Sequence, residues 1–152
     1  MQTAHTCTLL RRLAAILYDS IVLIGLIFLA AVPPTLLYGG GISEPLPAFG
    51  MQLYLLAVAF AFFGGFWTHG GQTIGMRAWR IRVVDSDGRE ITWRHALARF
   101  LAAILSWAAV GIGFAWSLFD PERLTWHDRL SATRTVHLVA EAKSARRQQQ
   151  SD

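Results

Sequence analysis

The sequence predicts a mostly α-helical integral membrane protein with two transmembrane helices, a third apolar span or re-entrant helical hairpin, and a small cytoplasmic β-structure. Hydrophobic residues make up 53% of its 152 residues and charged residues only 16%, against roughly 25% charged in soluble domains. The apolar residues are gathered in three blocks, at residues 13–32, 49–67 and 100–119. These blocks leave too little polar chain to cover a soluble core, so we expect contact with a lipid bilayer.

The first two blocks have the length of membrane spans. A helix of about 20 residues, at about 1.5 Å rise per residue, crosses a hydrocarbon core of roughly 30 Å. The first block follows the basic pair Arg11 and Arg12, as in a signal peptide, but it is longer than the usual apolar region of such a peptide and contains Asp19. We therefore expect a retained anchor.

The distribution of basic residues predicts the orientation. Two arginines precede the first block, no Lys or Arg lies in residues 38–48, and six arginines lie in residues 68–99. By the positive-inside rule, the N-terminus and the second connection are cytoplasmic. Six further basic residues follow the third block, which favours a cytoplasmic C-terminal tail.

Residues 100–119 leave two alternatives open. A single span through this block would place the basic tail outside the cell. A tight turn at Gly111 and Gly113, in the middle of the block, would instead give a re-entrant pair of half-helices, which is tolerated where protein covers the exposed backbone. Glycine is also common in spanning helices, so its presence does not decide between the two.

Two segments outside the blocks have the alternating pattern of β-strands. They are residues 78–85 and 133–139, and a third strand from residues 90–92 would complete a small sheet. Thr92 is suited to cap a helix that begins at Trp93 and leads into the third block. On that helix we expect Arg94, His95 and Arg99 to reach lipid phosphate. Residues 9–139 would form the membrane domain and residues 140–152 a disordered polar tail.

Asp19 is the first candidate functional residue. A carboxylate within a span is costly unless it is paired, hydrated or protonated. Arg12 lies seven residues earlier on the same helical face, so the two side chains are expected to share a network. The functional interpretation is a proton or cation site. The alternative is a structural one, in which a buried polar contact holds the helices in register.

His127 and Asp128 follow the third block. A metal hydrolase would need more His and Asp ligands at helical spacing, and the single cysteine excludes a paired thiolate site. No nucleophile–base pair, phosphate-binding loop or cofactor fingerprint is present, so we expect no enzyme activity and no cofactor. Topology and anionic lipid explain the basic connection, so we expect no nucleic-acid partner. We predict one cytoplasmic polar cluster of Arg12, Asp19, His127 and Asp128.

Together these residues resemble the RDD family of bacterial membrane proteins, over residues 9–139. The family is named for one arginine and two aspartates, which here are Arg12, Asp19 and Asp128. Ala132 stands where many relatives have glycine. The other matching segments are Gly71-Gln72-Thr73-x-Gly75, Val83-Val84-Asp85-x-x-Gly88 and Trp126-His127-Asp128-x-x-Ser131-x-Thr133.

The resemblance implies a multi-pass protein of the bacterial inner membrane, in a family without an established molecular function. Some members have been linked to sodium–proton antiport. Two hypotheses follow, a component of proton or cation transport, or a non-catalytic membrane scaffold or accessory subunit whose buried charges are structural. With so few spans, either would act as a homo-oligomer or with another membrane protein.

Overall fold

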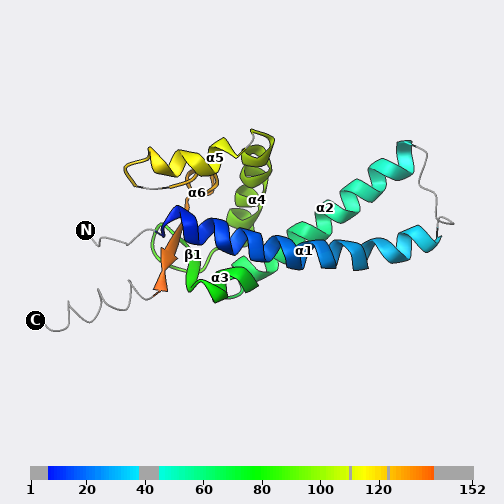
Figure 1. The fold of residues 1–152 in the computed structure, drawn as a ribbon, viewed down its shortest axis with the longest axis horizontal. Coiled ribbons are helices and arrows are strands. Elements are labelled where there is room, and N and C mark those ends of the chain that lie inside the picture. Colours follow the sequence, from blue (N-terminus) through cyan, green and yellow to red (C-terminus); the bar gives the residue numbers. More distant parts are fainter. Residues whose placement is uncertain (1–6, 38–44, 110, 123, 139–152) are drawn as a thin grey trace, which may run out of the picture.

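The two longest elements are apolar helices, α1 (Leu9–Leu37) and α2 (Pro45–Thr68). The computed structural model describes residues 7–37, 45–109, 111–122 and 124–138. Both helices are long and apolar enough to cross a membrane, over Leu9–Leu37 and Ala48–Thr68. Figure 1 shows α1 along most of the length of the molecule, with α2 slanting across it. The prediction of a mostly helical protein with two candidate spans is confirmed.

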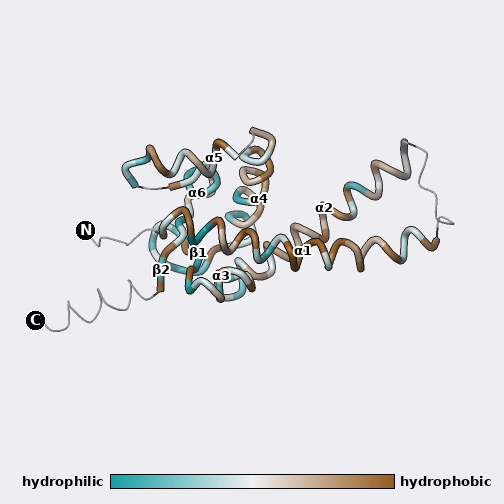
Figure 2. Tube along the Cα trace, in the orientation of Figure 1, coloured by the Kyte–Doolittle hydropathy of each residue, from teal (hydrophilic) through white to brown (hydrophobic). Residues whose placement is uncertain are grey.

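The far ends of these helices carry exposed apolar side chains. Phe28 and Leu36 on α1 are 73% and 75% exposed, and Figure 2 shows hydrophobic residues along much of this part of α1. Polar residues gather instead at the N-terminal end of α1, around the sheet and the short helices. Such extended apolar surface is typical of contact with lipid.

The short elements are packed around the N-terminal end of α1 (Figure 1). They form the polar module of the protein, and it contains most of the candidate site. In chain order they are α3 (Ile74–Ala78), β1 (Ile81–Asp85), α4 (Trp93–Ala108), α5 (Ile112–Ala115), the 3-10 helix η1 (Trp116–Leu118), α6 (Trp126–Leu130) and β2 (Thr133–His137).

Strands β1 and β2 pair antiparallel, with Ile81 opposite His137 and Asp85 opposite Thr133. The predicted pairing of the two segments is confirmed, and Ile81 and Val83 are buried as expected. Val139, the last residue of the second predicted strand, lies outside the described residues, as does the predicted tail 140–152.

The predicted third strand is wrong, because the sheet has two strands in the described part of the chain. After β1 the chain turns at Asp85, whose carboxylate accepts hydrogen bonds from the backbone N–H groups of Asp87 and Arg89. Ile91 then packs into the hydrophobic core instead of joining the sheet.

The third apolar block is bent. Helix α4 begins at Trp93, as predicted, and ends at Ala108. The chain then turns at Gly111, whose φ of 78° favours glycine, and the Gly111 N–H donates to the Ser106 carbonyl at 2.8 Å. Figure 1 shows α5 folding back from the end of α4. A third span is not confirmed, and the block forms a helix, a turn and two short helices.

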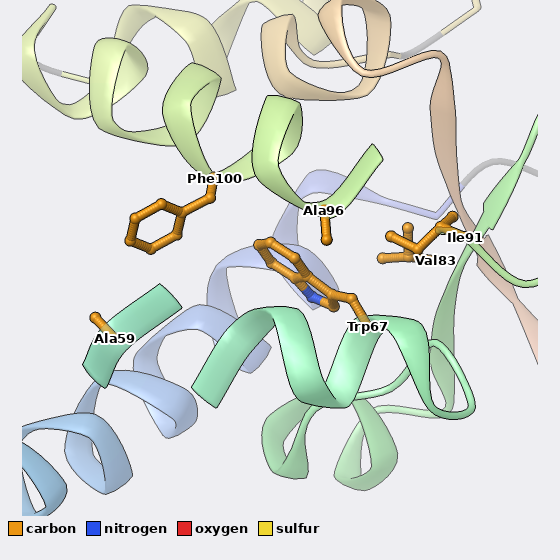
Figure 3. Packing of buried hydrophobic residues seen from close by; sticks show 6 residues of the cluster. All are labelled: Ala59, Trp67, Val83, Ile91, Ala96 and Phe100. Carbon is orange, nitrogen blue, oxygen red and sulfur yellow. The ribbon is translucent and has the colours of Figure 1, made fainter. Parts of the chain in front are cut away.

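A small core joins α2 to the polar module. Figure 3 shows Trp67 of α2 reaching toward Ala96 of α4, with Val83 and Ile91 beside them. Phe100 extends the same cluster along α4. This packing fixes α4 against α2, and it thereby positions the charged residue Arg99 within the protein.

Candidate functional site

Asp128 of α6 is the fully buried centre of a charged group. Its carboxylate binds Arg12 of α1 and Arg99 of α4, and the distance from Arg99 Nη1 to Asp128 Oδ1 is 2.5 Å. We call Arg12, Arg99 and Asp128 the arginine–aspartate centre. It ties together three elements that are far apart in the sequence, which makes it a strong structural constraint.

Helix α6 has only five residues, and Asp128 also supports its first turn. The Thr125 hydroxyl accepts from the Asp128 N–H, while the Asp128 carboxylate accepts from the Thr125 N–H at 3.3 Å. Reciprocal capping of this kind satisfies two backbone donors of a helix end. Arg99 is held in turn by the hydroxyls of Thr133 and Thr135, at 2.7 and 3.1 Å.

The electrostatics of the centre keep Asp128 ionised. Burial by itself raises the pKa of a carboxyl group, but the guanidinium groups of Arg99 and Arg12 hold the pKa of Asp128 far below its usual value. Burial, and then the positive charge of Arg99, lower the pKa of His127 to about 3. His127 is therefore neutral at physiological pH. Two guanidinium groups facing one carboxylate leave the centre with one net positive charge.

Asp19 of α1 has different partners. Its carboxylate accepts hydrogen bonds from the Thr73 hydroxyl and, at 2.8 Å, from the Gly75 N–H. Both donors belong to the start of α3, where Thr73 is also the N-cap. Among the described residues, no Lys, Arg or His forms an ion pair with Asp19. It is a buried carboxylate held by uncharged donors.

Gly75 allows α3 to lie directly against α1. A Cβ atom at this position would lie 2.3 Å from the Ala15 carbonyl oxygen and 3.0 Å from the Asp19 side chain. The contact with the Ala15 carbonyl is closer than real structures permit, so the glycine is required by the approach of the two backbones. The Thr73-x-Gly75 segment is therefore part of the Asp19 site.

The single cluster expected from the sequence is thus divided in two. Arg12 and Asp128 do meet, and His127 lies beside them, but Asp19 is bound to α3 instead. Arg12 and Asp19 are seven residues apart, about 10 Å along the helix axis, and the nearest donors at the level of Asp19 come from α3. Two separate carboxylate sites result.

Arg99 is the functional residue that sequence reasoning placed wrongly. It was expected to reach lipid phosphate, but its side chain is buried and bound to Asp128. A signal was present, because Arg99 lies three residues after Ala96 and three before Ala102, two small apolar residues that are buried on the same helical face. A basic residue on that face needs a buried acidic partner.

A model of the RDD family matches residues 6–132. The chain belongs to the RDD family. The matched range includes Arg12, Asp19, Arg99 and Asp128, and it ends just before β2. Neither the curated proteins nor the solved structures gave a match. The chain is accordingly an RDD family membrane protein with two candidate spans.

In this RDD protein both carboxylate sites adjoin one cavity. A cavity of about 420 Å³ lies between α1, α2 and α4, and both Asp19 and Arg12 line it. Within the described ranges, no group of three His, Cys, Asp or Glu side chains is arranged to hold a metal ion. The cavity walls away from the charged residues are mainly apolar and include Leu23, Phe63 and Ile104.

Proposed function

We propose that this RDD protein is a component of a proton or cation transport assembly, in which Asp19 takes up the transported ion. The observation that carries the proposal is the position of Asp19, a buried carboxylate on a candidate span that lines a cavity and, within the described residues, is bound only by uncharged donors. A carboxylate has about four acceptor sites, so the two hydrogen bonds leave room for a proton or a small cation.

Asp128 is less suited to that role. Two arginines already neutralise it, and its hydrogen bonds also hold α6 together. An ion that bound there would first have to displace a guanidinium group, at a cost of several kcal/mol for a buried pair. The proposal therefore assigns exchange to Asp19 and a positioning role to Asp128.

The proposal places the protein in the bacterial inner membrane, with the N-terminus and the polar module in the cytoplasm. Six arginines in residues 68–99 support this orientation. The pairing of β2 with β1 holds residues 133–137 beside that same basic connection, which supports the same side of the membrane for both. Since two candidate spans do not enclose a path, a homo-oligomer or another membrane protein would complete it.

A second candidate function is that of a non-catalytic scaffold or accessory subunit. The arginine–aspartate centre favours it, because this centre joins α1, α4 and α6 and needs no ligand to do so. In this alternative, Asp19 serves only to hold α3 against α1. Neither function requires an enzyme activity or a cofactor.

Ion flux through liposomes tests the proposal. The full chain would be reconstituted with an internal pH-sensitive dye, and proton movement would be recorded under sodium and potassium gradients. We expect gradient-driven flux that is lost in Asp19→Asn, which cannot cycle a proton, and kept in Asp87→Asn, a control on the exposed turn after β1. Both variants would be checked for normal insertion.

Two results would contradict the transport proposal. If liposomes that contain the wild-type chain show no flux under either gradient, transport by a homo-oligomer of this chain is excluded, and the scaffold function is favoured. Flux that persists in correctly inserted Asp19→Asn would show that Asp19 does not carry the ion. The outcome of the control separates these results from a general effect of altered surface charge.

A further inference from the structure

Helix α4 presents an apolar face to its surroundings. In residues 97–108 every exposed side chain is apolar or aromatic, whereas the charged Arg99 is buried. Leu97, Leu101 and Leu105 recur every four residues and are 46%, 56% and 55% exposed, so they form one stripe along the helix. A helix at a water-exposed surface has the opposite pattern, with its polar face outward. The stripe therefore needs an apolar partner.

The packing of α4 places it beside the apolar interior of a candidate span. The ring centroids of Trp93 and Phe100 lie 5.9 and 5.3 Å from that of Phe60 on α2. Phe60 lies eight residues before Thr68, where this span ends, and eight residues of helix measure about 12 Å. One leaflet of a hydrocarbon core of roughly 30 Å measures about 15 Å. With α2 across the bilayer, α4 lies within the leaflet next to the polar module.

The strand pairing argues against a crossing at α4. Strand β1 precedes α4, β2 follows α6, and the two strands are paired. The chain between them therefore begins and ends on one side of the membrane, so it could cross only an even number of times. In the described part of the chain between α4 and β2, no helix has more than five residues, about 8 Å, so none can make the return. Helix α4 itself runs across the direction of α1 (Figure 1).

Arg94 favours lipid over protein as the partner of this face. It is exposed and lies seven residues before Leu101, on the same side of the helix. Within the described ranges its guanidinium group forms no ion pair. A long basic side chain beside an apolar face can extend to anionic headgroups while the apolar side chains stay among acyl chains. A second copy of α4 would supply no anion, because this helix contains no Asp or Glu.

We propose that α4 lies embedded in the leaflet next to the polar module, without crossing the bilayer, and that its leucine stripe contacts lipid acyl chains. The stripe consists of Leu97, Leu101 and Leu105. The helix thereby anchors the polar module to the membrane. This inference goes beyond the proposed transport, because it assigns a lipid contact and requires no movement of ions.

Nitroxide spin labels test the surroundings of the stripe. Leu97→Cys, Leu101→Cys and Leu105→Cys would be made one at a time in a Cys7→Ala chain, which has no other cysteine. Each labelled full chain would be reconstituted in vesicles of phosphatidylcholine and phosphatidylglycerol. Collisions with oxygen, which concentrates among acyl chains, would be compared with collisions with a water-soluble nickel chelate. We expect oxygen collisions to dominate at all three positions.

Two reference positions calibrate the labels. Phe28→Cys lies on the exposed apolar part of α1, so oxygen collisions should dominate there as well. Asp87→Cys lies on the exposed turn after β1, where collisions with the nickel chelate should dominate. The stripe should match the first reference and differ from the second.

A membrane-impermeant maleimide tests whether the chain crosses between β1 and α6. Ser86→Cys and Glu122→Cys, both at exposed positions before and after α4, would be treated in spheroplasts of a bacterial expression host, before and after permeabilisation. We expect the two cysteines to respond alike, because they lie on the same side of the membrane.

Three outcomes would overturn the proposal. Collisions with the nickel chelate at the stripe, as at Asp87→Cys, would place this face in water. Protection from both reagents, with broadening from a nearby label, would mean that a second copy covers it. Reaction of Ser86→Cys and Glu122→Cys from opposite sides would make α4 a crossing.

A second background keeps the test independent of one substitution. The Cys7 thiol donates to the Thr8 carbonyl at 3.4 Å, which a serine hydroxyl can also do, so Cys7→Ser replaces Cys7→Ala if the latter does not fold. The outcome is also separate from that of the flux assay. Absence of flux leaves the lipid contact of α4 unaffected, and labels in water on α4 leave Asp19 and its exchange unaffected.

Discussion

Asp128 and Asp19 are both buried carboxylates at the same end of the molecule, yet their surroundings differ. Asp128 is bound by two guanidinium groups and by the cap of a short helix. Asp19 is bound by a hydroxyl and a backbone N–H from α3. The difference teaches that burial alone does not give a carboxylate its role. The charge of its hydrogen-bond donors decides whether the carboxylate is already neutralised by the protein or can still bind a proton or a cation.

The largest expected effect is the loss of the Asp128 charge. Asp128→Asn leaves Arg12 and Arg99 buried without an ionised partner, and it should lower the free energy of unfolding by about 3–5 kcal/mol. Thermal unfolding in detergent would measure the loss. Asp87→Asn, whose exposed carboxylate lies 3.8 Å from Arg89, should change stability by no more than about 0.5 kcal/mol. Equal stability of the two variants would contradict the structural role of Asp128.

A smaller effect is expected from closing the space at Gly75. In Gly75→Ala, the added methyl group meets the Ala15 carbonyl and the Asp19 side chain, so α3 must move and its bond to Asp19 weakens. Overpacking of this kind costs about 1–3 kcal/mol, again measured by thermal unfolding. Gly65→Ala in α2, where the methyl group meets nothing within 4 Å, is the control. A fully stable Gly75→Ala variant would show that Asp19 does not depend on α3.

The pH dependence of stability provides the next test. The pKa of His127 is lowered from 6.5 to about 3 by burial and by Arg99 and Arg12, against the opposing effect of Asp128. The folded state therefore disfavours the imidazolium. The contribution of His127 to stability is complete above pH 6.5 and is lost as the pH falls toward 3, at about 1.4 kcal/mol per pH unit.

Replacing His127 should reduce this slope. Denaturant unfolding between pH 6.5 and 5 should show a loss in the wild type that is smaller, by about 2 kcal/mol, in His127→Gln. His69→Gln, at the exposed end of α2, should keep the wild-type slope. Identical slopes for wild type and His127→Gln would mean that His127 is accessible to water in its charged form.

The smallest effect is expected for Asp19→Asn. An asparagine side chain can accept from the Gly75 N–H and can also donate to the Thr73 hydroxyl, so stability should change by less than about 1 kcal/mol. Asp19→Leu leaves both donors of α3 without an acceptor, so its free energy of unfolding should fall by about 1–3 kcal/mol in the same assay. A loss in Asp19→Asn as large as that in Asp128→Asn would remove the distinction between the two sites.

Much of the fold could be predicted from residue patterns along the sequence. The apolar blocks gave α1 and α2, the alternation around Ile81 and Val136 gave the two strands, and Thr92 marked the start of α4. Each of these signals is local, because helix periodicity, strand alternation and capping depend on neighbouring residues. The bend of the third block was recognised as one alternative from Gly111, but its selection depends on how α5 packs against α4.

The candidate site was harder to derive from sequence. The association of Arg12 with Asp128 was anticipated from the high cost of burying single charges. The separation of Asp19 from that pair depends on the close approach of α3 to Ala15, which needs the three-dimensional path after Gly71. Arg99 was misplaced because its partner lies 29 residues away, and no periodicity within α4 specifies a partner on another element.

The link between Arg12 and Asp128 has a consequence for the order of events during synthesis. The two residues are separated by 116 positions, and chains are made at roughly 5–20 residues per second. Asp128 is therefore made roughly 6–23 s after Arg12, when the first span is already available for insertion. During that interval the guanidinium group must remain in water or at the lipid headgroups. The N-terminal end of α1 thus becomes buried late, because β2 follows α6 in the chain and can cover it only after Asp128 has been made.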